Sequence, residues 1–370
     1  MTARKIFKRL SKAAPYRHPL LQIGDVIRHK LKINTSPGDY YLFEFYKGGK
    51  SWEEKKGYIG RYGSYYWPYE TIALKDMIML TNKDLQKHMF LGMGLPVPEL
   101  LATAGRDYAI QSPEGLEAHL DSWKFDIVIK PISSTGGANV LVLRRETDGF
   151  FGMGGEEWSR DRLWEFLERH FEGGCLIERR VFNVGQTAQI YPHSLNTFRI
   201  VTIRSMDGKW HVPVHTLKFG SGNIGVDNIK AGGIMVLLDE QGVAVQALSD
   251  FFTQPVSHHP DSGLPLTGFK PEGFSEVIDL SLRASRRLAL FGTIGWDIAY
   301  TAHGPMIIEA NTLWGANYQR FFGPVVRGEL AEGLKKHRFY SRYSRTHIFP
   351  RLQKRSFWPW RRTRWWAGDN

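Results

Sequence analysis

A lysine stands inside an apolar stretch and is followed closely by a loop of small residues. The stretch is "IVIKP", in which Lys130 is the charged residue. The loop consists of Ser133, Ser134, Thr135, Gly136 and Gly137. An unpaired ammonium group in a buried strand is costly, so we expect an anionic ligand to balance Lys130. Exposed N–H groups of such a loop can bind phosphate oxygens, and the combination therefore indicates a phosphate site.

Two acids and an amide stand on a second pair of predicted strands. Asp297 lies in "IGWDIAYT", and Glu309 and Asn311 lie in "MIIEANT", after a turn at residues 303–305. Alternation along a strand puts Glu309 and Asn311 on one face. Carboxylate and amide oxygens suit a magnesium ion that also binds phosphates. The alternative is a half-exposed polar strand face, but with Lys130 and its loop the three donors indicate a nucleoside triphosphate site.

Other phosphate and metal motifs are missing or incomplete in the sequence. There is no GxxxxGK[ST], and the GxGxxG at 220–225 is followed by a predicted loop and strand, whereas a dinucleotide site needs a helix there. Cys175 is the single cysteine, which excludes a disulfide framework or a cysteine-rich zinc site and suits a reducing cytoplasm. No apolar segment has the length of a signal peptide core or a membrane span. We therefore expect a cytoplasmic protein.

The positive charge is concentrated at the two ends of the chain. The formal net charge is +12, with eleven Lys and Arg and no acid between 335 and 364, and nine against one acid between 4 and 32. Residues 2–14 have an amphipathic helical pattern, and the tail "RSFWPWRRTRWW" interleaves tryptophans with cations. Such segments favour an anionic membrane surface, at the inner face if the protein is cytoplasmic. Single-stranded nucleic acid is an alternative partner for the tail, which no accompanying nucleic-acid motif supports, and packing of the tail on the body is another.

Single helices alternating with hairpins must carry these residues. Hydrophobic periodicity, caps and turns predict helices at 81–92, 160–171 and 274–292. The same signals predict strands or hairpins at 125–131, 139–145, 175–181, 198–219, 232–245, 294–301 and 306–312. Hairpins interleaved with single helices are typical of an α+β fold.

The ordered set of motifs resembles the ATP-grasp superfamily, most closely the sugar-transfer-associated ATP-grasp family. The matching segments are "NKDLQKHMFLGMGLPVPELL", "IVIKPISSTGGANVLVL", "CLIERRV", "SLNTFRIVTIR", "NIKAGGIMVLL" and "GWDIAYTAHGPMIIEANTLWG", roughly Asn82 to Gly323. The resemblance implies two α+β subdomains that clasp ATP. Two features depart from it: "FNVGQTAQ" lacks the acid that often holds the ribose, and residues 1–80 do not resemble a standard substrate domain.

Carried over by position, the resemblance implies a role for each candidate residue. Lys83 and Lys130 would contact phosphates, with the loop from Ser133 to Gly137 around them. Arg199 would stabilise the transferring phosphoryl group, and Lys218 would lie nearby. The adenine edge would meet Glu178, Arg179, Arg180 and Val181. One or two Mg²⁺ ions would be ligated by Asp297, Glu309 and Asn311.

The resemblance implies an ATP-dependent ligase that joins a small-molecule carboxylate to an amine through an acyl phosphate. Surface polysaccharide or glycoconjugate modification is the expected context, with glycan-linked substrates. A kinase that phosphorylates a hydroxyl and a non-catalytic binding module with basic arms are the alternatives. We expect a basic N-terminal segment at 1–36 and a helical region at 37–100. A nucleotide subdomain at 101–182 and a metal-binding catalytic subdomain at 183–332 follow, and a basic tail occupies 333–370.

Overall fold

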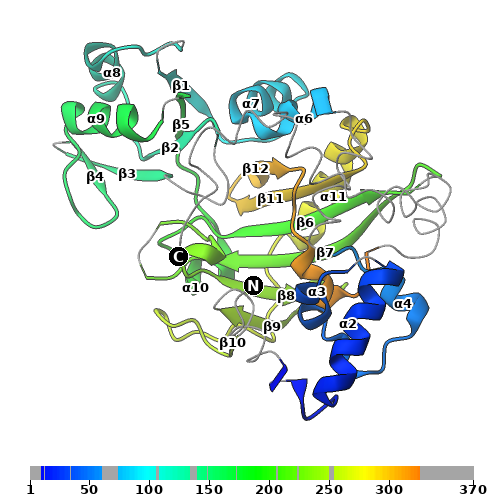
Figure 1. Cartoon of the computed structure of the whole chain (residues 1–370). Coiled ribbons are helices and arrows are strands. Elements are labelled where there is room, and N and C mark those ends of the chain that lie inside the picture. The colour runs from blue at the N-terminus through cyan, green and yellow to red at the C-terminus, as the bar shows by residue number, and fades with distance from the viewer. Residues whose placement is uncertain are drawn as a thin grey trace. The chain divides into compact units, whose positions relative to one another are not determined.

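The computed structural model divides the chain into two compact units (Figure 1). One comprises Met1–Glu70, Ser205–Gly208 and Gly315–Asn370, and the other comprises Thr71–Arg204 and Lys209–Trp314. The residues described are 10–11, 13–33, 35–60, 74–105, 108–133, 140–147, 149–171, 173–205, 207–222, 225–249 and 254–325. The phosphate-loop residues Ser134 to Gly137, most of the predicted helix at 2–14 and the basic tail lie outside these ranges.

The first unit, here called the helical unit, is built from short helices around an aromatic core. Its helices are α2 (Pro19–Ile33), α3 (Pro37–Leu42), η1 (Phe45–Lys47), α4 (Trp52–Lys56), η3 (Ala316–Tyr318) and α12 (Gln319–Phe322). Ser36 and Ser51 cap α3 and α4 by accepting hydrogen bonds from backbone N–H groups, which satisfies donors that a helix N-terminus leaves free. Tyr40, Phe43 and Phe45 are buried in the core. Short helices lie in the described part of the predicted helical region up to Lys56, whereas α2 was not predicted as a helix.

The second unit contains a five-stranded antiparallel sheet that carries one of the two charged groups described below. Its strand order is β1 (Leu100–Ala104), β5 (Cys175–Arg179), β2 (Ile127–Pro131), β3 (Leu141–Glu146) and β4 (Gly149–Gly152). Ile127, Ile129 and Ile177 point into a core formed with α8 (Pro113–Leu120) and α9 (Arg160–His170) (Figure 1). Alternation along β2 therefore turns Val128 and Lys130 to the opposite face.

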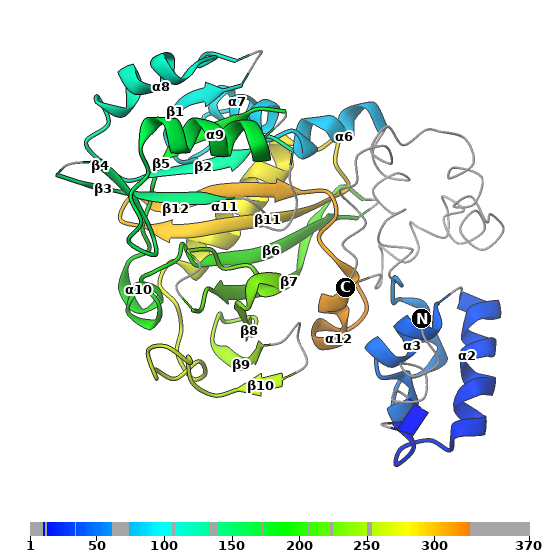
Figure 2. The ribbon, with the colours of Figure 1, turned by 60° about the vertical axis from the view of Figure 1, so that its left-hand side comes forward.

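The second sheet of this unit has seven strands, all paired antiparallel. Its order is β10 (Gln254–Val256), β9 (Ala244–Ser249), β8 (Ile234–Leu238), β7 (Trp210–Phe219), β6 (Thr197–Arg204), β11 (Thr293–Thr301) and β12 (Gly304–Asn311). Figure 2 follows this sheet from β12 to β10, with α11 (Phe274–Arg287) packed on it and α10 (Gly185–Ile190) at one end. The buried Trp296 donates from Nε1 to the hydroxyls of Thr202 and Ser285. This bond network fixes α11 against β6 and β11.

Helix α7 (Lys83–Gly92) follows α6 (Leu74–Thr81) and contacts both sheets. Asn82 caps α7 and accepts from the backbone N–H groups of Asp84 and Leu85, each at 3.0 Å, as its sequence predicts. Gln86 exchanges two hydrogen bonds with the backbone of Ala310 on β12, at 2.8 and 3.0 Å. The backbone N–H of Lys83 donates to the carbonyl of Ile132, which directly follows β2. One short helix is therefore tied to both sheets.

The α+β fold class predicted from the sequence is confirmed, as are the hairpins that carry the candidate residues. One element is shorter than predicted, because α11 ends at Arg287 and not at Gly292. Leu288 leaves the helical conformation with φ −101° and ψ 39°, and Leu288 and Phe291 turn into the core. Their apolar spacing therefore reflects a buried turn after the helix. Among the residues that the structure describes, no helix is long and apolar enough to cross a membrane.

Candidate nucleotide and metal site

Lys130 has a partner within the chain, the carboxylate of Glu178. Val128 on β2 lies directly opposite Glu178 on β5, so Lys130, two residues further on, is its diagonal neighbour on the same face. Lys130 Nζ lies 2.5 Å from Glu178 Oε2. Lys87 Nζ on α7 lies 2.6 Å from the other oxygen, Oε1, and also donates to the carbonyl of Pro98 at 2.6 Å. The sequence prediction missed this internal ion pair, since it assigned Lys130 only to a ligand.

The electrostatics of this trio are dominated by burial and mutual charge. Glu178 is 3% exposed and Lys87 is 5% exposed. Burial by itself would raise the pKa of Glu178, but the ammonium groups of Lys130 and Lys87 outweigh it and hold that pKa below its usual value. Burial lowers the pKa of Lys87, and repulsion from Lys130 adds to the effect while Glu178 opposes it. The trio thus combines two basic groups with one acid, and Lys130 and Glu178 lie on the face of the sheet opposite the core formed with α8 and α9.

Lys83 lies one helical turn before Lys87 and reaches the other sheet. Its Nζ is 3.2 Å from Oε1 of Glu309 on β12. Residues four apart lie on one face of a helix, and the Gln86 bonds to Ala310 fix which part of β12 they meet. Helix α7 therefore presents Lys83 to a predicted metal ligand and Lys87 to the predicted adenine edge. Lys83 was predicted from the sequence to contact phosphate, whereas Lys87 was not predicted as a site residue.

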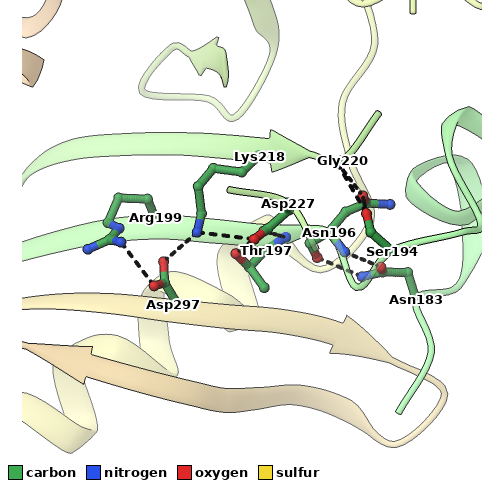
Figure 3. Close-up of polar contacts among 9 residues, drawn as sticks. All are labelled: Asn183, Ser194, Asn196, Thr197, Arg199, Lys218, Gly220, Asp227 and Asp297. Atoms are coloured by element: carbon green, nitrogen blue, oxygen red, sulfur yellow. Dashed lines mark hydrogen bonds and ion pairs between the residues drawn. The ribbon is translucent and has the colours of Figure 1, made fainter. Parts of the chain in front are cut away.

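A second charged group crosses three neighbouring strands of the seven-stranded sheet (Figure 3). Arg199 on β6 is directly opposite Asp297 on β11, and its Nη2 lies 2.9 Å from Asp297 Oδ2. Lys218 on β7 places Nζ 3.1 Å from Asp297 Oδ1. The side chains of Lys218 and Asp297 are each 9% exposed. Both residues predicted as catalytic therefore meet a predicted metal ligand.

Gly295 makes room for this arrangement two residues before Asp297. A Cβ atom at Gly295 would lie 2.4 Å from Cβ of Trp314 and 3.3 Å from Nη1 of Arg199. Real side chains do not approach so closely, so any larger residue at 295 would displace either the tryptophan or the guanidinium. Trp314 is itself held by a 2.8 Å hydrogen bond from Nε1 to Thr293. The glycine therefore helps to set the position of Arg199.

The three predicted metal ligands share the β11–β12 hairpin. Asp297 is directly opposite Glu309, and Asn311 is opposite Gly295. The side chains of all three thus lie on one face of the hairpin. A bulge follows this point, because the next pair is Ile298 with Ile307. The sequence placed Asp297 and Glu309 on partner strands, and the register puts them side by side.

The donor set fits a magnesium ion. Within the described ranges no three His, Cys, Asp or Glu side chains cluster closely enough to hold a metal, so a site here depends on Asn311 as its third donor. The Nδ2 atom of the Asn311 amide is buried and makes no hydrogen bond within the described part of the chain; the amide oxygen, Oδ1, is the atom that would contact a metal. Oδ1 of Asp297 likewise lacks a hydrogen bond of good geometry, although it forms the 3.1 Å ion pair with Lys218. Two carboxylates and an amide of this kind are ligands that magnesium takes.

Comparison with known protein families identifies the fold to which this geometry belongs. The family model described as "Sugar-transfer associated ATP-grasp" matches residues 65–333, well over half of the chain. The chain belongs to this ATP-grasp family. The resemblance inferred from the sequence motifs is thereby confirmed, and its range from Asn82 to Gly323 falls inside the matched residues. No curated protein matches the chain.

Solved ATP-grasp structures give matches at low sequence identity. N5-carboxyaminoimidazole ribonucleotide synthetase in its ADP complex is 17% identical with a TM-score of 0.38, and the match covers 63% of this chain and 45% of that one. L-amino acid ligase from Bacillus licheniformis is 15% identical, with a TM-score of 0.37 and coverage of 63% and 40%. D-alanyl-alanine synthetase A from Vibrio cholerae is 12% identical, with a TM-score of 0.41 and coverage of 75% and 72%. The chain spans less than half the length of the first of these matches.

Asp227 of this ATP-grasp chain was not among the site residues predicted from the sequence, and its carboxylate side chain is 14% exposed. Its Oδ2 accepts hydrogen bonds from the backbone N–H of Thr197 at 2.9 Å and from the Thr197 hydroxyl at 2.5 Å. Its Oδ1 lies 3.5 Å from Lys218 Nζ. Burial raises the pKa of Asp227, with Asp297 adding repulsion, while Lys218 opposes the rise. Lys218 thus lies between two carboxylates, in the line of side chains seen in Figure 3.

A network of amides and hydroxyls at the start of β6 supports this group. Asn196, which is fully buried, accepts from the hydroxyl of Ser194 at 2.7 Å and donates to the carbonyl of Tyr191 at 2.6 Å. Its backbone N–H donates to Oδ1 of Asn183 at 2.7 Å, and Ser194 accepts from the N–H of Gly220 at 3.1 Å (Figure 3). Satisfied buried networks hold their members rigidly. This one fixes the ends of β6 and β7, from which Thr197 and Lys218 project.

The remaining predicted residues are less closely grouped. Arg180 pairs with Asp126 at 3.0 Å, and Arg179 lies 3.5 Å from Glu99 and over the ring of Phe125. Each of these cations therefore has a structural partner within the five-stranded sheet or beside it. Val181 is the second residue after β5, and Ser133 lies exposed after β2.

Proposed function

We propose that this chain is an ATP-dependent ligase that joins a carboxylate to an amine. The observation that carries the proposal is the pair of cationic groups: Lys83, Lys87 and Lys130 around α7, and Arg199 and Lys218 beside Asp297. Cations and metal-type oxygen donors without an evident nucleophile suit phosphoryl transfer, which depends on positioning and charge stabilisation.

On this proposal the two cationic groups contact different parts of the bound nucleotide and its metal. Lys83 and Lys130 would bind phosphate oxygens together with the loop from Ser133 to Gly137, and the segment from Glu178 to Val181 would meet the adenine. Lys87 is a positioning residue, because it holds Glu178 from the side opposite Lys130. Magnesium, held by Asp297, Glu309 and Asn311, would supply positive charge to the phosphate oxygens.

Arg199 and Lys218 are the groups that we propose act on the transferring phosphoryl. A carboxylate oxygen of the substrate would attack the γ-phosphorus of ATP, which breaks the bond to the β,γ-bridging oxygen and releases ADP. The amine would then attack the carbonyl carbon of the acyl phosphate, lose a proton, and expel inorganic phosphate. Both steps spread negative charge over oxygens that the two cations could stabilise.

The substrates we propose are small carboxylates and amines, including glycan-linked ones. An amino acid and a uronic acid are suitable representatives, because the family's description refers to sugar transfer. The test is an ATPase screen of the full chain with magnesium against pooled amino acids and uronic acids, with products detected by mass. A product heavier than its acid by the amine less water supports ligation. ATP turnover that depends on none of the pooled acids would contradict it.

Hydroxylamine separates ligation from the kinase alternative. An acyl phosphate reacts with hydroxylamine to give a hydroxamate, whereas a phosphate ester of a hydroxyl group does not. The proposal therefore expects hydroxamate formation that depends on ATP and on the carboxylate substrate. A phosphorylated product that is stable to hydroxylamine would establish the kinase.

Location and membrane contact are part of the same proposal. We propose a cytoplasmic enzyme whose basic ends bring it to the inner face of an anionic membrane. The predicted apolar positions Ile6 and Phe7 and the tail from Trp358 to Trp366 lie outside the described residues. Vesicle binding by the full chain that weakens as salt rises would support this.

A further inference from the structure

Helix α2 has its polar side facing inward and its apolar side facing outward. Gln22 is fully buried, and its amide nitrogen donates to the carbonyls of Leu10 at 3.3 Å and Arg17 at 2.6 Å. Its oxygen accepts from the hydroxyl of Tyr41 at 3.1 Å. His29 is 3% exposed and stacks on Phe45 with ring centroids 5.2 Å apart. These polar groups thus share the inward side with Val26 and Ile33, which pack against the aromatic core, although that side of a helix normally holds mainly apolar residues.

Asp25 belongs to the same inward side of α2. Its carboxylate accepts from Arg17 at 2.9 Å and from the hydroxyl of Tyr40 at 3.1 Å. It is the one acidic residue in the helix. The amide of Gln22 and the carboxylate of Asp25 are therefore satisfied within the helical unit, whereas the buried Nε2 atom of His29 makes no hydrogen bond to the described residues. The negative charge of α2 is paired with Arg17.

The outward side carries a continuous apolar stripe. Leu20 is 71% exposed, Ile23 47%, Ile27 54% and Leu31 77%. At about 100° per residue these four side chains fall within an arc of roughly 80° along a helix of 15 residues. A scattered exposed leucine needs no explanation, but an aligned apolar face on a helix whose other face is buried marks an interaction surface. The four residues are called the α2 stripe below.

Cations lie along both edges of the α2 stripe. On the helix, Lys30 falls beside Ile23 on one edge, and Arg28 and Lys32 fall on the other edge. All three are exposed, and the guanidinium of Arg28 lies 4.8 Å from the ring of Trp52. An apolar stripe between cationic edges is the pattern of a helix that lies flat in the interface of an anionic membrane.

We propose that α2 is a membrane-contact helix whose stripe enters the headgroup boundary of an anionic bilayer. The positive charges along the α2 stripe indicate which partner covers it. Pairing two α2 stripes from two copies of the chain would bring their Arg28, Lys30 and Lys32 side chains together, and like charges repel. The C-terminal Lys- and Arg-rich tail would be repelled for the same reason. Anionic headgroups meet both features, since they attract the cations and accept the apolar side chains. The inference does not depend on the proposed ligase activity.

The test is vesicle sedimentation of the full chain with equal parts of phosphatidylglycerol and phosphatidylcholine, and with phosphatidylcholine alone. The variant Leu20→Ser/Leu31→Ser removes two exposed side chains, so its melting temperature should match that of the unchanged protein. Loss of apolar burial at two positions is expected to weaken binding to anionic vesicles about tenfold or more. The matched control is Val245→Ser/Leu290→Ser, which changes exposed apolar residues of the other unit and should leave binding unchanged.

A second variant examines the charged edges. Lys30→Gln/Lys32→Gln should reduce the preference for phosphatidylglycerol and the salt dependence, because each cation near an anionic surface contributes to binding. Unchanged vesicle binding by Leu20→Ser/Leu31→Ser would overturn the proposal and leave the chain termini as the attachment. A protein that binds neither type of vesicle would also overturn the proposal. A protein that dimerises without lipid in sedimentation velocity, and becomes monomeric with Leu20→Ser/Leu31→Ser, would show that a second copy is the occupant.

Discussion

The substitution Glu178→Gln tests the buried charge trio directly. Glu178 has a lysine on each carboxylate oxygen, at 2.5 and 2.6 Å, and the side chains of Lys87 and Lys130 are 5% and 13% exposed. Glutamine keeps the size of the side chain but removes the negative charge, so two buried ammonium groups remain without an anion. Removing one partner of a buried ion pair costs about 3–5 kcal/mol. For a unit of this size that corresponds to a fall in melting temperature of roughly 6–20 °C.

The pH dependence of the loss identifies its cause. Burial already lowers the pKa of Lys87, and without Glu178 this pKa falls further, so Lys87 in the variant loses its proton at a lower pH. A lysine whose pKa is lowered by folding destabilises the folded state while it is protonated. This cost is full below the folded pKa and disappears as pH rises through the unfolded pKa. The melting-temperature difference between the two proteins should therefore be largest near neutral pH and shrink as pH rises toward the unfolded lysine pKa. In the unchanged protein, the lowered pKa of Glu178 contributes stability that is lost as pH falls below its ordinary value.

The assay is thermal melting by circular dichroism at neutral and alkaline pH. Glu168→Gln, an exposed glutamate on α9, is the matched control and should change the melting temperature by very little. Adding Lys87→Met to Glu178→Gln removes one of the uncompensated cations and should restore part of the lost stability. A Glu178→Gln protein that melts within about 2 °C of the unchanged one, less than 1 kcal/mol by the same scaling, would refute the reasoning. A large loss that is the same at every pH would also refute it.

Two further predictions concern the proposed activity. Lys130→Ala should reduce ATP turnover by orders of magnitude, yet lower the melting temperature less than Glu178→Gln does, because Lys87 still pairs with Glu178; turnover near the original level would exclude a phosphate role. Glu309→Gln should also reduce turnover by orders of magnitude and shift the magnesium dependence to higher concentration, since it removes a charged ligand while Lys83 loses its 3.2 Å partner. Full activity in excess EDTA would contradict the metal assignment.

Much of the fold follows from local sequence patterns. Asn82 before α7 and the alternation through Ile127 to Lys130 specify elements whose signals lie within a few residues of each other. The placement of Asp297 and Glu309 on partner strands was predictable for the same reason, because a tight turn joins β11 to β12. Their direct pairing was not predictable, because the bulge between Asp297 and Ile298 shifts the register away from the one that the turn sets. Local signals therefore located the hairpin that carries Asp297, Glu309 and Asn311, but not the register that places Asp297 opposite Glu309.

The contacts that the sequence could not give are non-local. Lys130 and Glu178 are far apart in the chain and meet only because β5 inserts between β1 and β2 in the sheet order. No pattern within either segment specifies that neighbour. Asp227 lies in a connection without regular structure, so neither periodicity nor spacing distinguishes it. Its importance follows only from its burial and its bonds to Thr197 and Lys218.

Helix α2 shows a different limit of sequence patterns. The spacing of Leu20, Ile23, Ile27 and Leu31 marks one apolar face, and such a face is normally predicted to pack against the core. The structure turns it outward because Gln22 and Asp25 find complete sets of partners inside the helical unit. Periodicity identifies a face but does not say what it contacts.

Within the chain, groups that the proposed function assigns to ATP and to magnesium are paired with one another. Lys83 is paired with Glu309, and Lys218 and Arg199 are paired with Asp297. Binding of magnesium and phosphate would therefore exchange partners, since each carboxylate would pass from a lysine or arginine to the metal as each cation passes to a phosphate oxygen. Such an exchange would give each cation and each carboxylate a new partner of opposite charge and would keep the side chains near their present positions. Preorganisation of this kind reduces the ordering that binding requires, and helix α7, tied to both sheets through Lys83 and Gln86, would bring the nucleotide side and the metal side of the exchange together.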